Sequence, residues 1–233
     1  MPTLQEINSL ERRYFDFLAA LFEKKGTTFT KNLLSQYAIR DTWSDYSGDM
    51  AFIQRGLESV IQSVIYESVD WEICSTPMGA DSIFQTARAM IHIDAKAYKS
   101  TDGDAIGNKL TLGPNQTSCF TESPLVYSGI PFYSNLPVTY AHKVYGRIPC
   151  LTFFLKLIYD LDNELDSFRK FQLYLYSLPN GLLNEILGTD YFQAGRAIKK
   201  NSQRTSIRLN FNRLEVEEAN PYKWKRYKEL DMI

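Results

Sequence analysis

The chain has 233 residues, with 26 Lys and Arg against 27 Asp and Glu, so its net charge is close to −1. Hydrophobic residues make up 44% and aromatic residues 14%, which excludes a disordered chain and is enough to bury a sizeable core. No run of about 18 apolar residues occurs, and no basic head precedes an apolar block, so we expect neither a membrane span nor a signal peptide. The three cysteines (Cys74, Cys119 and Cys150) are scattered and odd in number, which predicts a reducing, cytoplasmic location without a disulfide framework.

Two amphipathic helices are predicted in the first third of the chain. Leucine, isoleucine and phenylalanine recur at roughly helical spacing over residues 3–25, and this pattern stops at Gly26. Residues 50–68 repeat the pattern with a longer apolar stripe. Both segments are therefore expected to pack one face against other parts of a fold.

The middle of the chain has the periodicity of strands. Residues 82–86 and 89–98 read as two strands, and residues 91–98 alternate strictly between apolar and polar side chains. Residues 151–159 and 171–177 are rich in Leu, Phe and Tyr, as expected of buried central strands. Residues 205–214 alternate again. These patterns predict several strands of one sheet.

The end of the chain completes the expected fold class. Residues 222–230 are predicted to form a closing basic helix. Helices before and after a run of strands indicate an α/β fold of one domain over residues 1–233, with a mixed central sheet flanked by helices. No linker or internal repeat divides the chain.

Two acids and a lysine form the most informative group in the sequence. In a strand over residues 89–98, Asp94 and Lys96 share one face with His92 and Tyr98, because successive side chains point to opposite faces. If residues 82–86 pair with residues 89–94 as a hairpin, Asp81 returns close to Asp94. The sequence therefore predicts two carboxylates and one ammonium group at one place on the sheet.

Such a group is suited to phosphodiester hydrolysis. Two carboxylates can bind Mg²⁺, which prefers oxygen ligands and retains several waters. A water bound to the ion has a lowered pKa, and the ion neutralises charge that grows on a phosphate. A nearby lysine such as Lys96 can orient or deprotonate that water.

Asp81 followed by Asp94-Ala-Lys96 resembles the signature of the PD-(D/E)xK nucleases. Within that superfamily, residues 79–84, 93–98 and 109–113 are similar to segments of type II restriction endonucleases of the EcoRV and HincII kind. The resemblance covers residues 55–118. It departs from the signature at Ala80, where a proline is usual, with Pro77 four positions before Asp81.

The resemblance implies a restriction-endonuclease-like core and a Mg²⁺-dependent enzyme that cuts double-stranded DNA and leaves 5′-phosphate ends. It implies that Asp81, Asp94 and the backbone carbonyl of Ala95 hold the metal and that Lys96 acts on the water. The family also places a glutamate on the helix before the catalytic strands. Glu58 is the preferred residue for that role, and Glu67 on the same helix is its competitor.

DNA contacts are expected from three groups of residues. The basic C-terminal part, residues 193–233, contains a strand whose polar face would carry Arg208, Asn210 and Asn212, side chain types that pair with base edges. The polar turn residues Asn115, Gln116 and Thr117 are a second candidate group, and Lys99 is expected to contact the DNA backbone. For His92, a hydrogen-bonded structural role is favoured over contact with a phosphate.

A palindromic target cut on both strands requires two sites related by a two-fold axis, so a homodimer is expected. The helical region 3–68 is the predicted dimer region, and residues 50–180 are the predicted catalytic core. Two other functions remain open from the residues. The same core could serve a DNA repair or structure-specific nuclease, or Asp94 and Lys96 could form a simple ion pair in a non-catalytic DNA-binding or assembly protein.

Overall fold

The computed structural model describes residues 2–38, 49–74, 81–105, 109–118, 125–127, 130–162, 167–179, 192–194, 206–211, 216 and 220–232. Its helices are α1 (Leu4–Lys24), α2 (Gly26–Ala38) and α3 (Asp49–Ser68), with a short 3₁₀ helix at Pro114–Gln116. Its strands are β1 (Glu72–Cys74), β2 (Ser82–Gln85), β3 (Met90–Lys99), β4 (Lys109–Leu112), β5 (Leu125–Tyr127), β6 (Ile130–Phe132), β7 (Thr139–His142), β8 (Gly146–Asp162), β9 (Ser167–Leu178), β10 (Phe192–Ala194), β11 (Ile207–Asn210) and β12 (Tyr227–Leu230).

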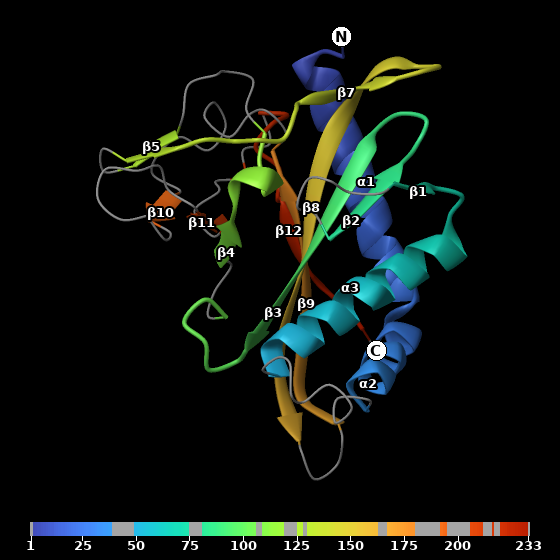
Figure 1. Ribbon diagram of the computed structural model, residues 1–233, viewed down its shortest axis with the longest axis vertical. Coiled ribbons are helices and arrows are strands. Elements are labelled where there is room, and N and C mark those ends of the chain that lie inside the picture. The colour runs from blue at the N-terminus through green and yellow to red at the C-terminus, as the bar shows by residue number, and fades with distance from the viewer. Residues whose placement is uncertain are drawn as a thin grey trace.

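A large mixed sheet forms the centre of the molecule (Figure 1). Its strand order is β1-β2-β3-β8-β9-β12, and β7 pairs with the beginning of β8. β3 and β8 run parallel, whereas the other described pairs of this sheet are antiparallel. The predicted mixed α/β fold is therefore confirmed, and the long apolar segments β8 and β9 are central strands as expected.

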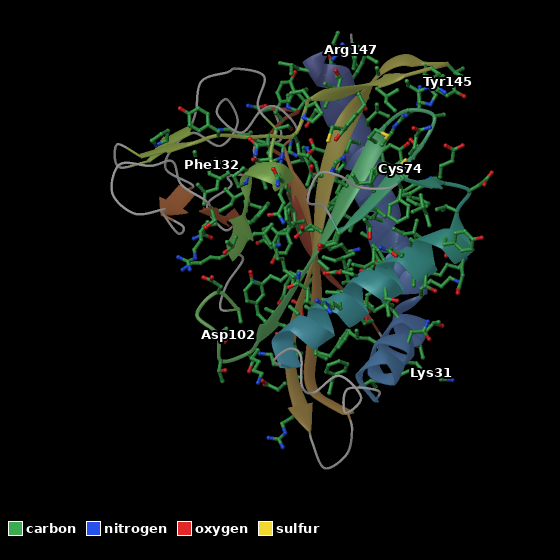
Figure 2. All side chains as sticks on the ribbon, in the orientation of Figure 1. Lys31, Cys74, Asp102, Phe132, Tyr145 and Arg147 are labelled. Atoms are coloured by element: carbon green, nitrogen blue, oxygen red, sulfur yellow. The ribbon has the colours of Figure 1, made fainter. Side chains whose placement is uncertain are left out.

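The two faces of the large sheet are covered differently. On one face, Ile91, Ile93 and Ala95 of β3 belong to the main core, together with apolar side chains of α1, α2 and α3. On the other face, Phe154 and Tyr176 pack against the small sheet β10-β11-β4 in a second core. Figure 1 shows the helices on one side of the large sheet and the small sheet on the other, and Phe132, labelled in Figure 2, lies on the side of the small sheet.

Local sequence signals account for the boundaries of α1. Thr3 caps the helix, because its hydroxyl accepts from the Glu6 N–H at 3.2 Å while the Glu6 carboxylate accepts from the Thr3 N–H at 2.7 Å. α1 ends at Lys24, as predicted, but α2 begins directly at Gly26, which the sequence did not indicate. A Cβ on Gly26 would lie 2.8 Å from the Met232 backbone, so this close approach of two chain segments requires glycine.

The predicted C-terminal helix over residues 222–230 is wrong. Tyr227–Leu230 form β12, which pairs antiparallel with Leu173–Tyr176 of β9 at the edge of the large sheet. The strand partner lies about fifty residues earlier in the chain, so the hydrophobic pattern of residues 222–230 could not predict this pairing. The strand β11 within the predicted segment 205–214, by contrast, keeps the expected alternation: Ile207 and Leu209 are buried, and Arg208 and Asn210 are half-buried.

Part of the basic C-terminal region serves the fold. The Arg226 guanidinium is 1% exposed and forms an ion pair with Glu11 of α1 at 2.9 Å. Trp224 Nε1 donates to Asn8 Oδ1 at 3.0 Å, and Arg226 lies over the Trp224 ring. These contacts fasten the end of the chain to α1, so not every basic residue of this region is available for DNA.

The N-terminal helices were expected to supply a dimer contact because they are apolar on one face. Phe15, Leu18 and Phe22 of that face of α1 are buried in the main core of the same chain. The observation that suggested a dimer region at residues 3–68 is thus explained by intramolecular packing. Among the described residues, no helix has the length and apolar character needed to cross a membrane.

Candidate active site

Strand β3 places Asp94 and Lys96 on the same face, as the alternation predicts. Asp94 is 1% exposed, and its Oδ2 lies 2.5 Å from Lys96 Nζ. His92 and Tyr98 belong to the same alternation set, while Ile93 and Ala95 face the helices in the main core. Lys96 retains some contact with solvent, with 18% of its side chain exposed. The pair therefore lies at a boundary between the interior and solvent.

The hairpin of β2 and β3 brings Asp81 to this pair. The two strands are antiparallel, with Ser82 opposite Ile93, so Asp81 comes level with Asp94. The Ala95 backbone N–H donates to Asp81 Oδ2 at 2.6 Å. This bond fixes Asp81 just before the first residue of β2. From Asp94 onward, β3 has no described strand partner on the β2 side. The structure brings together the three residues of the signature.

Burial of two neighbouring carboxylates raises the pKa of both Asp81 and Asp94. Burial raises the pKa of Asp94 to about 7; attraction to Lys96 opposes this shift, and repulsion from Asp81 adds to it. Burial also raises the pKa of Asp81, against the Ala95 hydrogen bond and the Lys96 charge. A site that holds two carboxylates at such cost is suited to binding a cation.

Helix α3 contributes two further side chains to the site. Gln62 Nε2 donates to the Asp81 carbonyl at 3.3 Å and to the Ser82 hydroxyl at 3.0 Å. Glu58 lies one turn earlier on the same helix face. Burial and the nearby charge of Asp81 raise the pKa of Glu58, while Lys96 acts in the opposite direction. Glu58 is therefore within electrostatic reach of the site.

The competitor Glu67 lies elsewhere. It is exposed, and its carboxylate accepts a hydrogen bond from the Ser63 hydroxyl at 3.1 Å on the same helix. The charges of Asp81 and Lys96, by contrast, both act on the pKa of Glu58. The geometry thus favours Glu58 as the helix carboxylate.

The donor atoms of the site fit a hard divalent cation. Asp94 Oδ2 is buried, and the Lys96 ammonium is its charged neighbour at 2.5 Å. Asp81 and Asp94 offer carboxylate oxygens, the ligands that Mg²⁺ and similar ions prefer. Within the described ranges, no three His, Cys, Asp or Glu side chains are grouped closely enough to hold a metal. The protein therefore provides two carboxylates, and backbone, water and a substrate phosphate would supply the remaining ligands.

The polar turn at residues 115–117 lies beside the site. Asn115 is exposed, and its Oδ1 accepts from Asn135 Nδ2 at 2.9 Å. Gln116 points inward, and its Nε2 donates to Asp94 Oδ1 at 2.5 Å. Thr117 is fully buried, and its hydroxyl donates to the Pro114 carbonyl at 3.2 Å. Of these three expected DNA contacts, Asn115 has an exposed side chain, and burial leaves Thr117 no surface for DNA.

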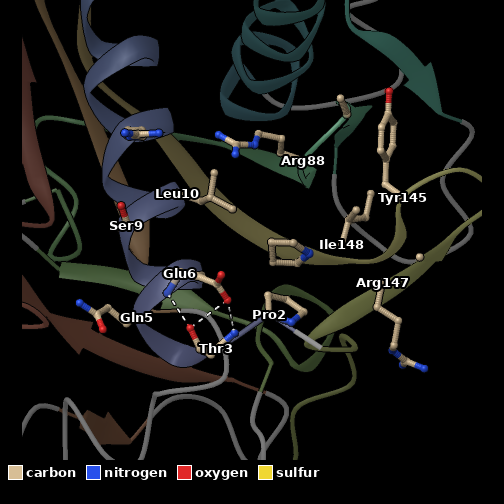
Figure 3. A pocket seen from close by; sticks show the side chains of 14 residues that line it. Pro2, Thr3, Gln5, Glu6, Ser9, Leu10, Arg88, Tyr145, Arg147 and Ile148 are labelled. Atoms are coloured by element: carbon tan, nitrogen blue, oxygen red, sulfur yellow. Dashed lines mark hydrogen bonds between the residues drawn. The ribbon is translucent and has the colours of Figure 1, made fainter.

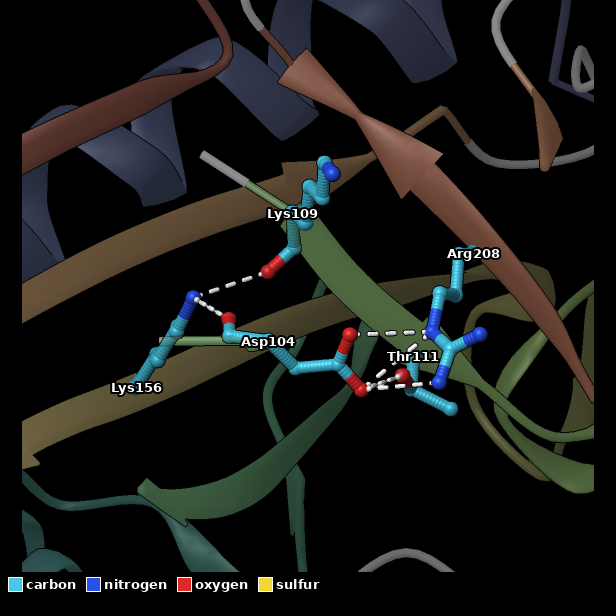
Figure 4. Close-up of polar contacts among 5 residues, drawn as sticks. All are labelled: Asp104, Lys109, Thr111, Lys156 and Arg208. Carbon is cyan, nitrogen blue, oxygen red and sulfur yellow. Dashed lines mark hydrogen bonds and ion pairs between the residues drawn. The ribbon is translucent and has the colours of Figure 1, made fainter. Parts of the chain in front are cut away.

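The expected DNA contacts on β11 and β3 are also placed by the structure. Arg208 Nε lies 3.0 Å from Asp104 Oδ1, and the guanidinium also donates to Asp104 Oδ2 (Figure 4). Asn210 shares the half-exposed face of β11 with Arg208. Lys99 is exposed at the end of β3. Asn212 lies outside the described residues.

A buried lysine joins the two sheets beside Arg208. Lys156 of β8 is fully buried, and its Nζ donates to the carbonyls of Asp104 at 2.8 Å and Lys109 at 2.9 Å (Figure 4). Its Nζ lies 5.0 Å from the centroid of the Tyr98 ring. Burial lowers the pKa of Lys156 to about 8. Lys156 contacts the middle of the segment between β3 and β4 at Asp104 and the start of β4 at Lys109, and through Asp104 it also helps to place Arg208.

His92 has the surroundings of a structural histidine, the role favoured from the sequence. It is fully buried, Nε2 lies 3.3 Å from the Tyr140 hydroxyl, and burial lowers its pKa to about 4. A neutral, buried imidazole does not attract a phosphate.

An open pocket lies away from these residues. It measures about 1030 Å³ and is formed by the start of α1, the β2–β3 turn and the β7–β8 turn (Figure 3). Arg88, Arg147 and Tyr145 line it, and none of the signature residues does. The signature residues therefore lie outside this pocket.

Sequence reasoning missed the supporting residues Gln62, Gln116 in its inward position, and Lys156. Two of these residues could have been recognised from the sequence. Gln62 follows Glu58 by four positions on a helix, which places both on one face. Lys156 interrupts an otherwise apolar strand, and a buried lysine requires partners. The contact of Gln116 with Asp94 spans 22 residues and left no signal.

Comparisons with known proteins give a consistent result. A family model described as type II restriction enzyme MwoI, N-terminal domain, matches residues 3–163. The crystal structure of the restriction endonuclease BglI bound to its DNA recognition sequence superposes with a TM-score of 0.73 at 17% identity, covering 98% of this chain and 91% of that one. Tetrameric SfiI bound to cognate DNA gives a TM-score of 0.67 at 17% identity, with 98% and 86% covered. No curated protein sequence matches significantly.

Proposed function

Because this chain belongs to the type II restriction enzyme family represented by the MwoI N-terminal domain, it is a site-specific deoxyribonuclease, and we propose that Asp81, Asp94 and Lys96 form its hydrolytic centre. The observation that carries the proposal is the convergence of these side chains. The Ala95 N–H holds Asp81 at 2.6 Å, and Lys96 lies 2.5 Å from Asp94. Family membership favours this class over a repair nuclease, and the site favours it over a non-catalytic protein.

We propose Mg²⁺ as the divalent ion of the site, held by Asp81, Asp94 and the Ala95 carbonyl. A residue that donates its N–H toward one edge of a strand also turns its carbonyl toward that edge. The Ala95 N–H is directed to Asp81, so its carbonyl is turned toward the same edge of β3. When bound, the ion would activate a water and neutralise charge on the scissile phosphate.

Lys96 would position the attacking water in this proposal. Its ammonium now pairs with Asp94 and retains access to solvent, so it can exchange that partner for a water or a phosphate oxygen. The water oxygen bonds to phosphorus while the bond from phosphorus to the 3′ oxygen breaks, which gives a 5′-phosphate and a 3′-hydroxyl. Glu58 would hold further waters, or a second ion, from the side of α3.

The DNA would lie over the exposed part of the site and reach the small sheet. Arg208 and Asn210 on β11, Asn115 on the polar turn and Lys99 at the end of β3 are the candidate contacts among the described residues. Arg and Asn pair with guanine and adenine edges in the major groove. Cleavage of both strands of a palindrome by one such site per chain requires a homodimer.

Cleavage of plasmid DNA with Mg²⁺ tests the proposal. The protein should give discrete fragments, and Lys96→Ala and Asp94→Ala should lower the rate by at least about 100-fold while DNA binding persists. Lys143→Ala, an exposed lysine in the turn between β7 and β8, is the control and should cut normally. Full activity of Lys96→Ala would overturn the assignment. Smears or cuts at junctions would favour a repair nuclease, and no cleavage with any divalent metal would favour a binding protein.

A further inference from the structure

The side chain of Gln116 makes two hydrogen bonds that fix its direction. The Gly113 backbone N–H donates to Gln116 Oε1 at 2.8 Å, and Gln116 Nε2 donates to Asp94 Oδ1 at 2.5 Å. A backbone N–H can only donate, so the amide oxygen must face Gly113 and the amide nitrogen must face Asp94. The orientation of the amide is therefore set by the turn that carries it.

That turn is itself held in place. The Asn135 N–H donates to the Pro114 carbonyl at 2.8 Å, and the Leu136 N–H donates to the Thr117 carbonyl at 2.9 Å. The buried Thr117 hydroxyl closes the turn through the Pro114 carbonyl at 3.2 Å. Gln116 thus extends from a turn that is hydrogen-bonded both internally and to residues 135–136.

The two oxygens of Asp94 consequently have different neighbours. Oδ1 accepts from Gln116, while Oδ2 faces the Lys96 ammonium at 2.5 Å. A carboxylate held by one oxygen has a fixed plane, so its second oxygen is presented in a constant direction. Groups that hold a metal-binding carboxylate in this way raise the affinity of the site for the ion.

We propose that Gln116 is a positioning residue, which fixes Asp94 through Oδ1 so that Oδ2 is presented to the divalent ion. This inference rests on the proposed function, in which Asp94 is a metal ligand. It assigns Gln116 to the metal site, whereas the sequence suggested a contact with DNA. Gln116 acts on the ion through Asp94 and touches no reacting atom.

Binding of Mn²⁺ alone to the DNA-free protein, followed by electron paramagnetic resonance, measures this effect without cleavage. Gln116→Met removes the donor to Asp94 and keeps a side chain of similar length. It should weaken Mn²⁺ binding by about 10- to 100-fold. Gln116→Ala, at the same half-exposed position, should do the same and replaces the methionine variant if that one fails to fold.

Thr117→Val is the matched control. It removes the hydroxyl that closes the same turn, but it leaves the contact between Gln116 and Asp94 in place. It should lower the melting temperature and keep the Mn²⁺ affinity. If Gln116 served only the turn, Thr117→Val would weaken Mn²⁺ binding as much as Gln116→Met, and that result would overturn the inference.

Asp94→Asn tests the proposed metal site separately from the role of Gln116. If it abolishes Mn²⁺ binding while Gln116→Met binds normally, the proposed metal site stands and the role of Gln116 is refuted. If Asp94→Asn binds Mn²⁺ like the unaltered protein, the metal site itself is misassigned, and the inference falls with it.

Discussion

The Asp81 carboxylate accepts a hydrogen bond from the Ala95 backbone N–H, with 2.6 Å between Oδ2 and the nitrogen. Two residues fourteen positions apart are thus joined where β2 begins and β3 continues. The bond uses a backbone donor of β3 that lies beyond the described pairing of β2 with β3. The bond holds the Asp81 carboxylate beside Asp94 through the backbone of β3, so this contact needs no other side chain.

Asp81→Asn should separate this structural contact from the charge. The asparagine carbonyl oxygen can still accept from the Ala95 N–H, so the fold and the DNA affinity should be retained. The loss of one negative ligand should lower the rate of Mg²⁺-dependent cleavage by at least about 100-fold, since a divalent ion depends on carboxylate charge. Cleavage kinetics and gel-shift binding measure the two effects, and a rate within a few fold of the unaltered protein would exclude Asp81 as a ligand.

Glu58→Gln should lower the cleavage rate by about 10- to 100-fold, because Glu58 would hold waters or an ion beside Asp81. The variant should unfold at no lower temperature, because it removes a carboxylate whose ionisation burial and Asp81 disfavour. Glu67→Gln on the same helix is the control and should cut at the normal rate. Equal losses of cleavage rate in the two variants would show that the negative charge of α3 as a whole supports cleavage, and not Glu58 in particular.

Lys156 should make the free energy of unfolding rise with pH in the alkaline range. Its pKa is about 8 in the folded protein against 10.5 in the unfolded chain, because burial disfavours the ammonium form. Between these values the unfolded chain binds more protons, so the stabilisation associated with this group is full above 10.5 and is lost as the pH falls through 8. Lys156→Met removes this dependence. The free energy of unfolding of the unaltered protein minus that of the variant should rise by about 1–3 kcal/mol from about pH 7 to about pH 10.

Denaturant unfolding at a series of pH values supplies this difference, and the comparison cancels the titration of the tyrosines. A difference that stays constant over the whole range would mean that Lys156 has the same pKa in both states. DNA cleavage provides a second readout, since Lys156 holds the segment that carries Asp104 beside Arg208.

The buried pair of Arg226 and Glu11 should be sensitive to loss of one partner. Arg226→Met leaves the Glu11 carboxylate buried without its cation, which should lower the free energy of unfolding by about 3–5 kcal/mol. Replacing both residues by methionine should cost less than Arg226→Met alone. The exposed pair of Lys228 and Glu23, also at 2.9 Å, is the matched control, and Lys228→Met should cost less than about 1 kcal/mol. Similar losses at the two sites in denaturant unfolding would contradict this account.

The sequence by itself determined the parts of the site that follow from local backbone geometry. A strand alternates its side chains with a period of two, so Asp94-Ala-Lys96 had to place both charged groups on one face. The short spacing between residues 82–86 and 89–98 is compatible with a tight hairpin, and such a hairpin returns Asp81 to Asp94. Helical spacing likewise predicted α1 and α3, and it placed Glu58 on a helix shortly before β2 and β3.

Only the tertiary structure decided which distant segments meet these elements. It showed that residues 227–230 extend the sheet at β9, that the small sheet covers the face opposite the helices, and that Gln116 turns inward to Asp94. Periodicity describes the direction of a side chain from its own backbone. Its partner depends on how remote segments pack, and no local pattern in one chain records that choice.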